Sequence, residues 1–316
     1  MNELADSEIR PQSRLGAVAL VYCTRLLSAL LVGAPIAGAL GATGVGQFPN
    51  GDAILFEPGA VHLVEALRIG APSLIAASQA AGLVLLVASV LSLVPLAALL
   101  VALCHGGPLG LGAWAGRTAE HLPTFVLLWG MTLLAQGCVL FIAVVGADAL
   151  RDALLARVSE RTADCVFLVL VVFGLVAALA LGVMQDLARS AAVRHGVGWR
   201  KAVLVAADIA RRKAPRALVG WAAPAAASVL LVGFFAVIVG ALHIERGSEL
   251  RLVGVVVAHQ LAAFATVLLR AFWLSTALRL VGPRVPSASF SPLPPASDDK
   301  SEDSAAPGDP SPSPGA

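Results

Sequence analysis

Six polar side chains that interrupt long apolar stretches are the first candidates for chemistry in this 316-residue chain. Arg25 lies about ten residues into the first stretch, and Arg270 lies toward the end of the last one. A charged side chain at membrane depth is costly unless it meets polar partners. The partners offered by the apolar stretches are Gln79, Gln136, His259 and Gln260. A cluster of these six side chains would be a low-dielectric site for an anion or a lipid headgroup.

A simpler interpretation accounts for the same residues. The long side chain of Arg25 can reach the headgroup zone while its stem stays in the apolar region. Arg270 lies near Trp273 and can do the same with a shorter reach. The glutamines would then form hydrogen bonds between helices, which contribute about 0.6 kcal/mol each on average.

No other set of residues forms a recognisable catalytic, metal or nucleotide motif. The six histidines include no HxxxH or HExxH spacing, and no GxxxxGK[ST] or GxGxxG sequence follows a strand-like run. The four cysteines show no CxxC spacing and are interpreted as packing residues. Asp186, Arg189 and His195 lie close together, but they supply no nucleophile with an oriented base. The sequence therefore predicts no metal, no cofactor and no nucleic-acid partner.

The composition indicates which elements position these residues. Hydrophobic residues make up 58% of the chain and charged residues 13%, against about 25% charged in a typical soluble domain. About 20 apolar residues in a helix cross a bilayer. We therefore predict an all-α fold, a polytopic transmembrane bundle of about six spans. The predicted spans cover residues 15–42, 72–104, 122–147, 164–186, 217–242 and 252–278.

Two features of these spans carry further expectations. The second span is too long for one upright helix and contains Pro95, so we expect a kinked or strongly tilted helix. Aspartate and glutamate occur only at the ends of the predicted spans. Proton relays, cation-coupled transporters and intramembrane aspartyl proteases need buried carboxylates, so these classes are disfavoured.

The distribution of basic residues predicts the orientation. With the N-terminus inside, fourteen lysines and arginines fall on the inner side and six on the outer side, and residues 187–216 hold eight of the fourteen. Basic loops stay in the cytoplasm. Trp114, Trp199, Trp221 and Trp273 fall near the same boundary, which is where amphipathic rings are enriched. We predict a bacterial inner-membrane protein with both termini cytoplasmic.

Three connecting segments are predicted to be amphipathic surface helices. Residues 198–213 place Trp199, Val203, Ala206 and Ala210 at helical spacing, and their basic residues suit the anionic lipids of the inner leaflet. Residues 148–161 and 59–68 show the same pattern on the outer side.

The domain prediction has three parts. Residues 1–14 form a cytoplasmic segment, residues 15–282 the transmembrane domain, and residues 283–316 a disordered cytoplasmic tail. Nine of the last 34 residues are proline, interleaved with serine and acidic residues. Such a segment cannot bury enough apolar surface to fold.

Small residues recur every four positions in the first span. Gly33, Ala37 and Gly41 form one row, and Ala34, Gly38 and Ala42 form a second. This pattern lets helix backbones approach closely. Packing within the chain is the default interpretation, and a homo-oligomer contact is the alternative.

Three stretches together resemble a widespread group of uncharacterised bacterial six-helix inner-membrane proteins of about this length. They are Asp52-Ala-Ile-Leu-Phe-Glu-Pro-Gly59 with Leu63 and Glu65-Ala-Leu-Arg68; Asp186-Leu-Ala-Arg189 with Ala191-Ala-Val193 and Arg211-Arg-Lys-Ala-Pro215; and Gln260-Leu261 with Arg270. The likeness spans most of residues 15–280, and this chain departs from it in having Leu187 where the group usually has an aromatic residue. The resemblance implies the six-span topology and implies no activity.

Three functional hypotheses follow. The first is a non-enzymatic accessory or scaffold protein of the inner membrane. The second is a transporter or channel for an anionic or lipid solute, with Arg25 as its electrostatic anchor. The third is a membrane-embedded enzyme that acts on lipids through Asp186, Arg189 and His195.

Overall fold

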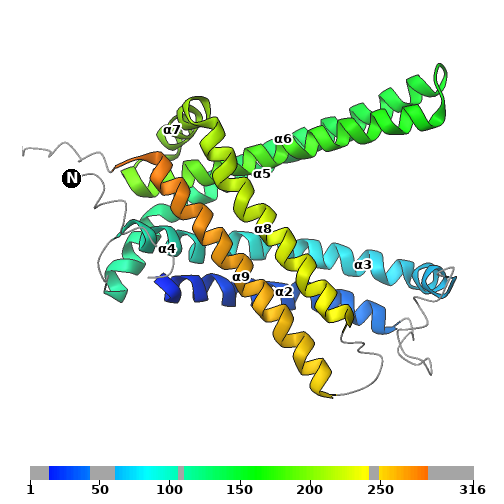
Figure 1. Cartoon of the computed structure of the whole chain (residues 1–316), viewed down its shortest axis with the longest axis horizontal. Coiled ribbons are helices and arrows are strands. Elements are labelled where there is room, and N and C mark those ends of the chain that lie inside the picture. Colours follow the sequence, from blue (N-terminus) through cyan, green and yellow to red (C-terminus); the bar gives the residue numbers. More distant parts are fainter. Residues whose placement is uncertain (1–13, 43–60, 106–109, 242–248, 284–316) are drawn as a thin grey trace, which may run out of the picture. The chain divides into compact units, whose positions relative to one another are not determined.

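The computed structural model describes residues 14–42, 61–105, 110–241 and 249–283. All regular structure in these ranges is helical, as predicted. The helices are α2 (Leu15–Ala42), α3 (Val61–Leu91), α4 (Leu93–Cys104), α5 (Leu111–Leu155), α6 (Glu160–His195), α7 (Trp199–Arg212), α8 (Ala214–Ala241) and α9 (Glu249–Val281). Figure 1 shows their order along the chain.

Six helical stretches are long and apolar enough to cross a bilayer, which confirms the predicted membrane architecture. They are Leu15–Ala39, Gly70–Cys104, Leu111–Leu155, Glu160–His195, Ala214–Ile238 and Val253–Val281. Large apolar side chains cover their outer surfaces; Phe141, Phe173 and Leu230 are 69%, 72% and 74% exposed. An aqueous surface does not tolerate so large an apolar patch, whereas lipid does.

The second stretch is broken where its proline predicts a kink. Helix α3 ends at Leu91 and α4 begins at Leu93, with a turn at Ser92. Pro95 has no backbone N–H to donate to the carbonyl of Leu91, and its ring clashes with that carbonyl. The regular helix is therefore interrupted at Ser92, in the wall of the site described below.

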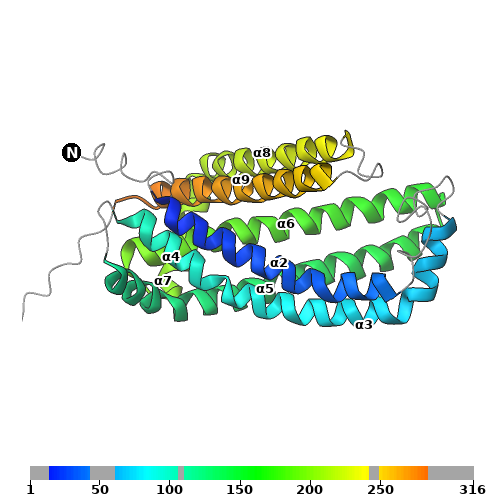
Figure 2. The ribbon, with the colours of Figure 1, turned by 90° about the horizontal axis from the view of Figure 1, so that it is seen from below.

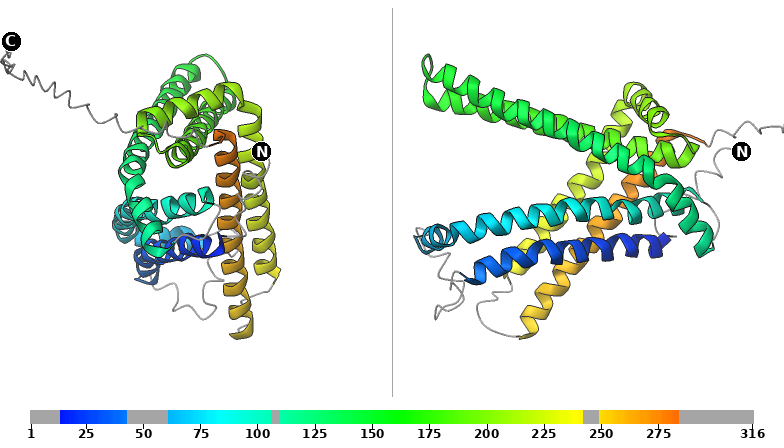
Figure 3. Two further views of the ribbon diagram at one scale, coloured as in Figure 1. Left: turned by 90° about the vertical axis from the view of Figure 1, so that its left-hand side faces the viewer. Right: turned by 180° about the vertical axis from the view of Figure 1, so that it is seen from behind.

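Helices α5 and α6 form an antiparallel hairpin, which is visible in Figures 1 and 3. The prediction of a separate surface helix over 148–161 is wrong, because α5 continues to Leu155 and α6 starts at Glu160. The Ser159 side chain caps α6 by accepting from the Thr162 N–H at 3.4 Å. The prediction for 59–68 is also corrected, because α3 runs without a break from Val61. In both cases helix propagation past the apolar span costs less than a new helix start.

Gly174 sets the closest approach within this hairpin. A Cβ at Gly174 would overlap the Cβ of Ala143 on α5, whereas a Cβ at Gly137 of the same hairpin would meet nothing within 4 Å. We expect Gly174→Ala to lower the free energy of unfolding by about 1–3 kcal/mol, because the two backbones must separate. Gly137→Ala is the matched control and should be neutral or slightly stabilising, since alanine favours helix. Chemical unfolding in mixed micelles measures both, and equal effects would contradict this packing.

The small-residue rows of α2 do not pack within the described chain. An added Cβ at Gly33, Gly38 or Gly41 would meet nothing within 4 Å. The default interpretation of close intrachain packing is therefore wrong at these glycines. Their low volume leaves this helix face smooth and accessible, and the homo-oligomer contact stays a prediction.

The largest group of buried side chains lies where α4, α6, α7 and α9 meet. Leu99, Leu187, Leu274 and Leu278 are at most 1% exposed there. The basic helix ends meet in the same region, as Figure 2 shows. Arg194 donates to the carbonyl of Gly282 at 3.1 Å, and Lys213 donates to that of Leu280 at 3.0 Å. These cations satisfy the free carbonyls at the end of α9 and favour its dipole.

These contacts also fix which helix ends lie together. Arg14, just before α2, donates to the carbonyl of His105, just after α4. The start of α2 and the end of α4 are therefore neighbours. The contacts of Arg194 and Lys213 likewise bring the ends of α6 and α7 to the end of α9. Both pairings match the alternation of spans that the sequence predicts.

Helix α7 is amphipathic, as predicted, but its buried face differs from the expected one. Ala202, Ala206 and Ile209 are buried, while Arg200 and Lys201 are exposed. Of the four residues expected on the apolar face, only Ala206 is fully buried. The buried row is the one that packs on α6 and α9, which sequence periodicity alone does not identify.

The predicted N-terminal segment lies almost wholly outside the described residues. The predicted disordered tail lies outside them from residue 284 onward.

Candidate functional site

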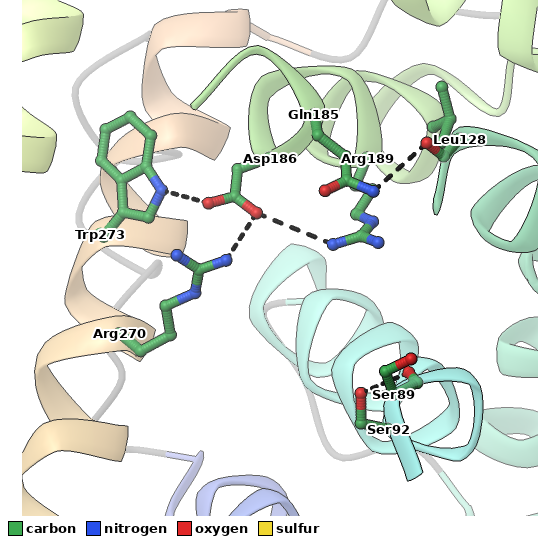
Figure 4. Close-up of polar contacts among 8 residues, drawn as sticks. All are labelled: Ser89, Ser92, Leu128, Gln185, Asp186, Arg189, Arg270 and Trp273. Carbon is green, nitrogen blue, oxygen red and sulfur yellow. Dashed lines mark hydrogen bonds and ion pairs between the residues drawn. The ribbon is translucent and has the colours of Figure 1, made fainter. Parts of the chain in front are cut away.

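The site is built around a buried carboxylate. Asp186 is 1% exposed and lies nine residues before the end of α6 at His195. Its Oδ2 accepts from the indole N–H of Trp273 at 2.8 Å, and its Oδ1 accepts from Arg270 at 2.7 Å. Figure 4 shows the carboxylate between these two side chains of α9 and Arg189 of its own helix.

Asp186 corrects two expectations. The predicted span ended at residue 186, but α6 continues to His195, so the carboxylate is interior to the helix rather than at its end. It is tolerated there because it is paired and hydrogen-bonded. Trp273 is 1% exposed and donates to Asp186, and its place near the inner boundary stays a prediction. Arg270 pairs with Asp186 instead of extending to the headgroups.

Arg189 lies one turn after Asp186 and is buried without full compensation. Its side chain is 6% exposed, and its Nη1 lies 3.9 Å from the Asp186 Oδ1, at the limit of an ion pair. The guanidinium carbon lies 5.7 Å from the centre of the Phe125 ring. Its Nε–H has no hydrogen-bond partner among the described residues. A buried donor on a charged group that lacks a partner is rare and expensive.

A cavity of about 270 Å³ adjoins these side chains. We call it the arginine cavity, since Arg25, Arg189 and Arg270 all contribute to its wall. The broken α3–α4 helix supplies Ser89 and Ser92 to the same wall. The complete lining is Val21, Thr24, Arg25, Ser89, Ser92, Leu93, Pro95, Leu96, Trp129, Thr132, Leu133, Gln136, Gln185, Arg189 and Arg270.

A second cavity of about 370 Å³ lies between α2, α8 and α9 and shares Arg25 and Arg270 with the first. Trp221, Pro224 and Ser228 of α8 contribute to its wall. Arg25 and Arg270 therefore lie between the two cavities. Arg25 makes no ion pair with a described residue, and its side chain is accessible.

The electrostatics of this arrangement are unbalanced. Two guanidinium groups, those of Arg189 and Arg270, lie against the Asp186 carboxylate, and Arg25 adds a third at the cavity wall, so the group carries two positive charges in excess. In an apolar surrounding, opposite charges attract far more strongly than in water. Guanidinium groups also match the geometry of phosphate and carboxylate oxygens. The hydroxyls of Thr24 and Ser89 in the same wall already donate to the carbonyls of Leu20 and Leu86, so the donors for an anion are mainly the guanidinium groups. The arrangement is suited to hold an oxyanion.

The structure brings together three of the six candidate residues from the sequence. Arg25, Gln136 and Arg270 line the arginine cavity, and the Gln136 amide also donates to the carbonyl of Ala178 at 2.8 Å. Gln79, His259 and Gln260 are not among the lining residues. Gln260 accepts from the hydroxyl of Tyr22, and His259 contacts the Val255 carbonyl at 3.1 Å.

Sequence reasoning did not place Asp186 and Arg189 in this cluster. The sequence groups them with His195 as the residues of a lipid-active enzyme, but His195 lines neither cavity. Their spacing of three residues on a helix was the available signal, because it puts both side chains on one face. Gln185 was also missed; its amide donates to the Leu128 carbonyl at 3.3 Å and lines the cavity.

The described residues contain no group of three or more His, Cys, Asp or Glu side chains that could hold a metal ion. The comparisons with family models, curated proteins and solved structures found no match to the chain.

Proposed function

We propose that this multi-pass membrane protein binds an oxyanion in the arginine cavity and serves as a transporter or carrier for an anionic solute or lipid. The observation that carries the proposal is the buried and incompletely paired guanidinium of Arg189, which belongs to a side chain that lines the cavity. Three guanidinium groups against one carboxylate supply the charge that an anion would neutralise. The position of Arg25 between two cavities suits passage past it.

The proposed setting is the bacterial cytoplasmic membrane with both termini inside. The excess of basic residues in the predicted inner segments supports this orientation. The exposed basic face of α7, with Arg200, Lys201 and Arg211, suits the anionic lipids of the inner leaflet.

The two other hypotheses have less support. The scaffold hypothesis rested partly on spans without interior carboxylates, and Asp186 weakens that argument. The lipid-active enzyme would use Asp186 as a base, but both of its oxygens already accept from Trp273 and Arg270. Membership of the six-helix group named by the resemblance stays a proposal.

Inorganic phosphate tests the anion site. A ligand that binds only the folded state raises the unfolding temperature, and the increase grows with the ratio of free ligand concentration to its dissociation constant. We expect sodium phosphate to raise the Tm of the purified protein above that in sodium chloride of equal ionic strength. Arg25→Gln should reduce this increase by at least half, because it removes one of the three guanidinium groups. Arg200→Gln, which changes an exposed arginine of α7, is the matched control.

If phosphate raises the Tm equally in the wild type and in Arg25→Gln, Arg25 is not part of the oxyanion site. No stabilisation by phosphate or sulfate over chloride in the wild type would reject the oxyanion site as a whole.

A further inference from the structure

A third cavity, which we call the apolar cavity, adjoins the arginine cavity. It has a volume of about 200 Å³ and lies between α5, α6 and α7. Leu128, Met131, Leu181 and Met184 are the largest apolar side chains in its wall. Thr132 and Gln185 line both cavities, so these two side chains lie between them.

We infer, resting on the oxyanion site proposed above, that the ligand is an anionic phospholipid whose acyl chain lies in the apolar cavity. A free phosphate would need only the guanidinium groups. A phospholipid needs a cationic site for its headgroup and an adjacent apolar channel for its chain. In this protein the arginine cavity and the apolar cavity lie side by side, and Thr132 and Gln185 are the residues that line both.

The wall that helix α7 contributes to the apolar cavity supports the same ligand. Val203 and Ala206 of α7 close the apolar cavity on one side. The opposite face of this helix is basic, as expected of a helix that lies in the headgroup zone of an anionic leaflet. A lipid of that leaflet therefore meets cations at the surface of α7 and apolar side chains directly beneath. Methionine at two wall positions suits a flexible chain, because its side chain adapts to irregular shapes.

The experiment compares three probes on the full-length protein in amphipol. Dihexanoyl phosphatidylglycerol carries both the anion and the chains, inorganic phosphate carries the anion alone, and dihexanoylglycerol carries the chains alone. We expect the phospholipid to bind at least tenfold more tightly than either of the other two. Titration calorimetry gives the three dissociation constants.

Two cavity-filling variants test the acyl-chain site. Ala135→Phe places a ring in the apolar cavity, and Leu134→Phe is its control on the adjacent, 72% exposed position. Val203→Phe is a second cavity-filling variant, with the 69% exposed Leu204→Phe as control. We expect each cavity variant to weaken phospholipid binding at least tenfold without changing phosphate binding. If Ala135→Phe does not fold, the phospholipid and phosphate affinities of Val203→Phe test the acyl-chain site instead.

The outcomes separate this inference from the proposed function. If the phospholipid binds no more tightly than phosphate, or if the filled cavities leave its binding unchanged, the acyl-chain site is rejected while the oxyanion site stands. If dihexanoylglycerol binds as tightly as the phospholipid, the inference is likewise rejected. If neither phosphate nor phospholipid binds, the proposed function fails with it.

Discussion

Arg189→Met is expected to weaken phosphate binding at least tenfold while leaving the free energy of unfolding unchanged or raising it. The guanidinium would supply charge-assisted hydrogen bonds to the anion, each contributing about 1.5–3 kcal/mol, and about 1.4 kcal/mol is tenfold in affinity. In the structure the same group is buried, lies 3.9 Å from a carboxylate oxygen of Asp186, and has a donor without a partner among the described residues. Methionine keeps the volume and removes that desolvation cost.

Opposite effects on binding and on stability distinguish a ligand-binding arginine from a structural one. Phosphate titration and chemical unfolding in mixed micelles measure the two quantities on the same preparation. Arg200→Met, at an exposed position beside the Trp199 ring, should change neither beyond a few tenths of a kcal/mol. If Arg189→Met lowers stability by more than about 2 kcal/mol, the side chain serves mainly the Asp186 network, and its assignment to the anion is wrong.

Asp186→Asn is expected to lower the free energy of unfolding by about 2–4 kcal/mol, because it leaves the buried Arg189 and the partly exposed Arg270 without a counter-charge. Arg270 loses a partner at 2.7 Å, and Arg189 loses the only carboxylate near it among the described residues. The amide oxygen of asparagine can still accept from Trp273, so the loss is mainly one of charge. Unfolding in mixed micelles, followed by tryptophan fluorescence, measures the change.

A double-mutant cycle tests whether this cost arises from the ion pair. Arg270→Gln removes the other charge, so Asp186→Asn/Arg270→Gln should be more stable than the sum of the single variants predicts by at least 1 kcal/mol. Asp208→Asn is the control, since the Asp208–Arg212 pair on α7 is exposed and contributes at most about 1 kcal/mol. Additive effects of Asp186→Asn and Arg270→Gln would show that the carboxylate and Arg270 do not depend on each other.

The sequence was sufficient for the large-scale architecture. Runs of about 20 apolar residues depend on bilayer thickness alone, so the spans could be predicted without any tertiary information. The break at Ser92 follows from the covalent structure of Pro95, and the helical periodicity of α7 is likewise local. Helix lengths were harder to predict from the sequence, because α5 continues past the apolar stretch to Leu155 along its partner α6.

The site itself depends on contacts between distant parts of the chain. Asp186 and Arg270 are 84 residues apart, and hydropathy alone treats Asp186 as the end of a span. Whether an arginine extends to the headgroups or turns inward depends on which helix packs beside it, and this was the alternative left open for Arg25. Gln79 and Gln136 are the same residue type in similar surroundings. Only helix packing places Gln136 in the cavity wall and Gln79 outside it.

A crystal structure with selenate would locate the anion site, since selenium scatters anomalously and selenate has the shape and charge of an oxyanion. We expect an anomalous peak in the arginine cavity with a selenate oxygen about 3 Å from a guanidinium nitrogen of Arg189. Selenate bound only at the outer surface of α7, with none in the arginine cavity, would contradict the oxyanion site.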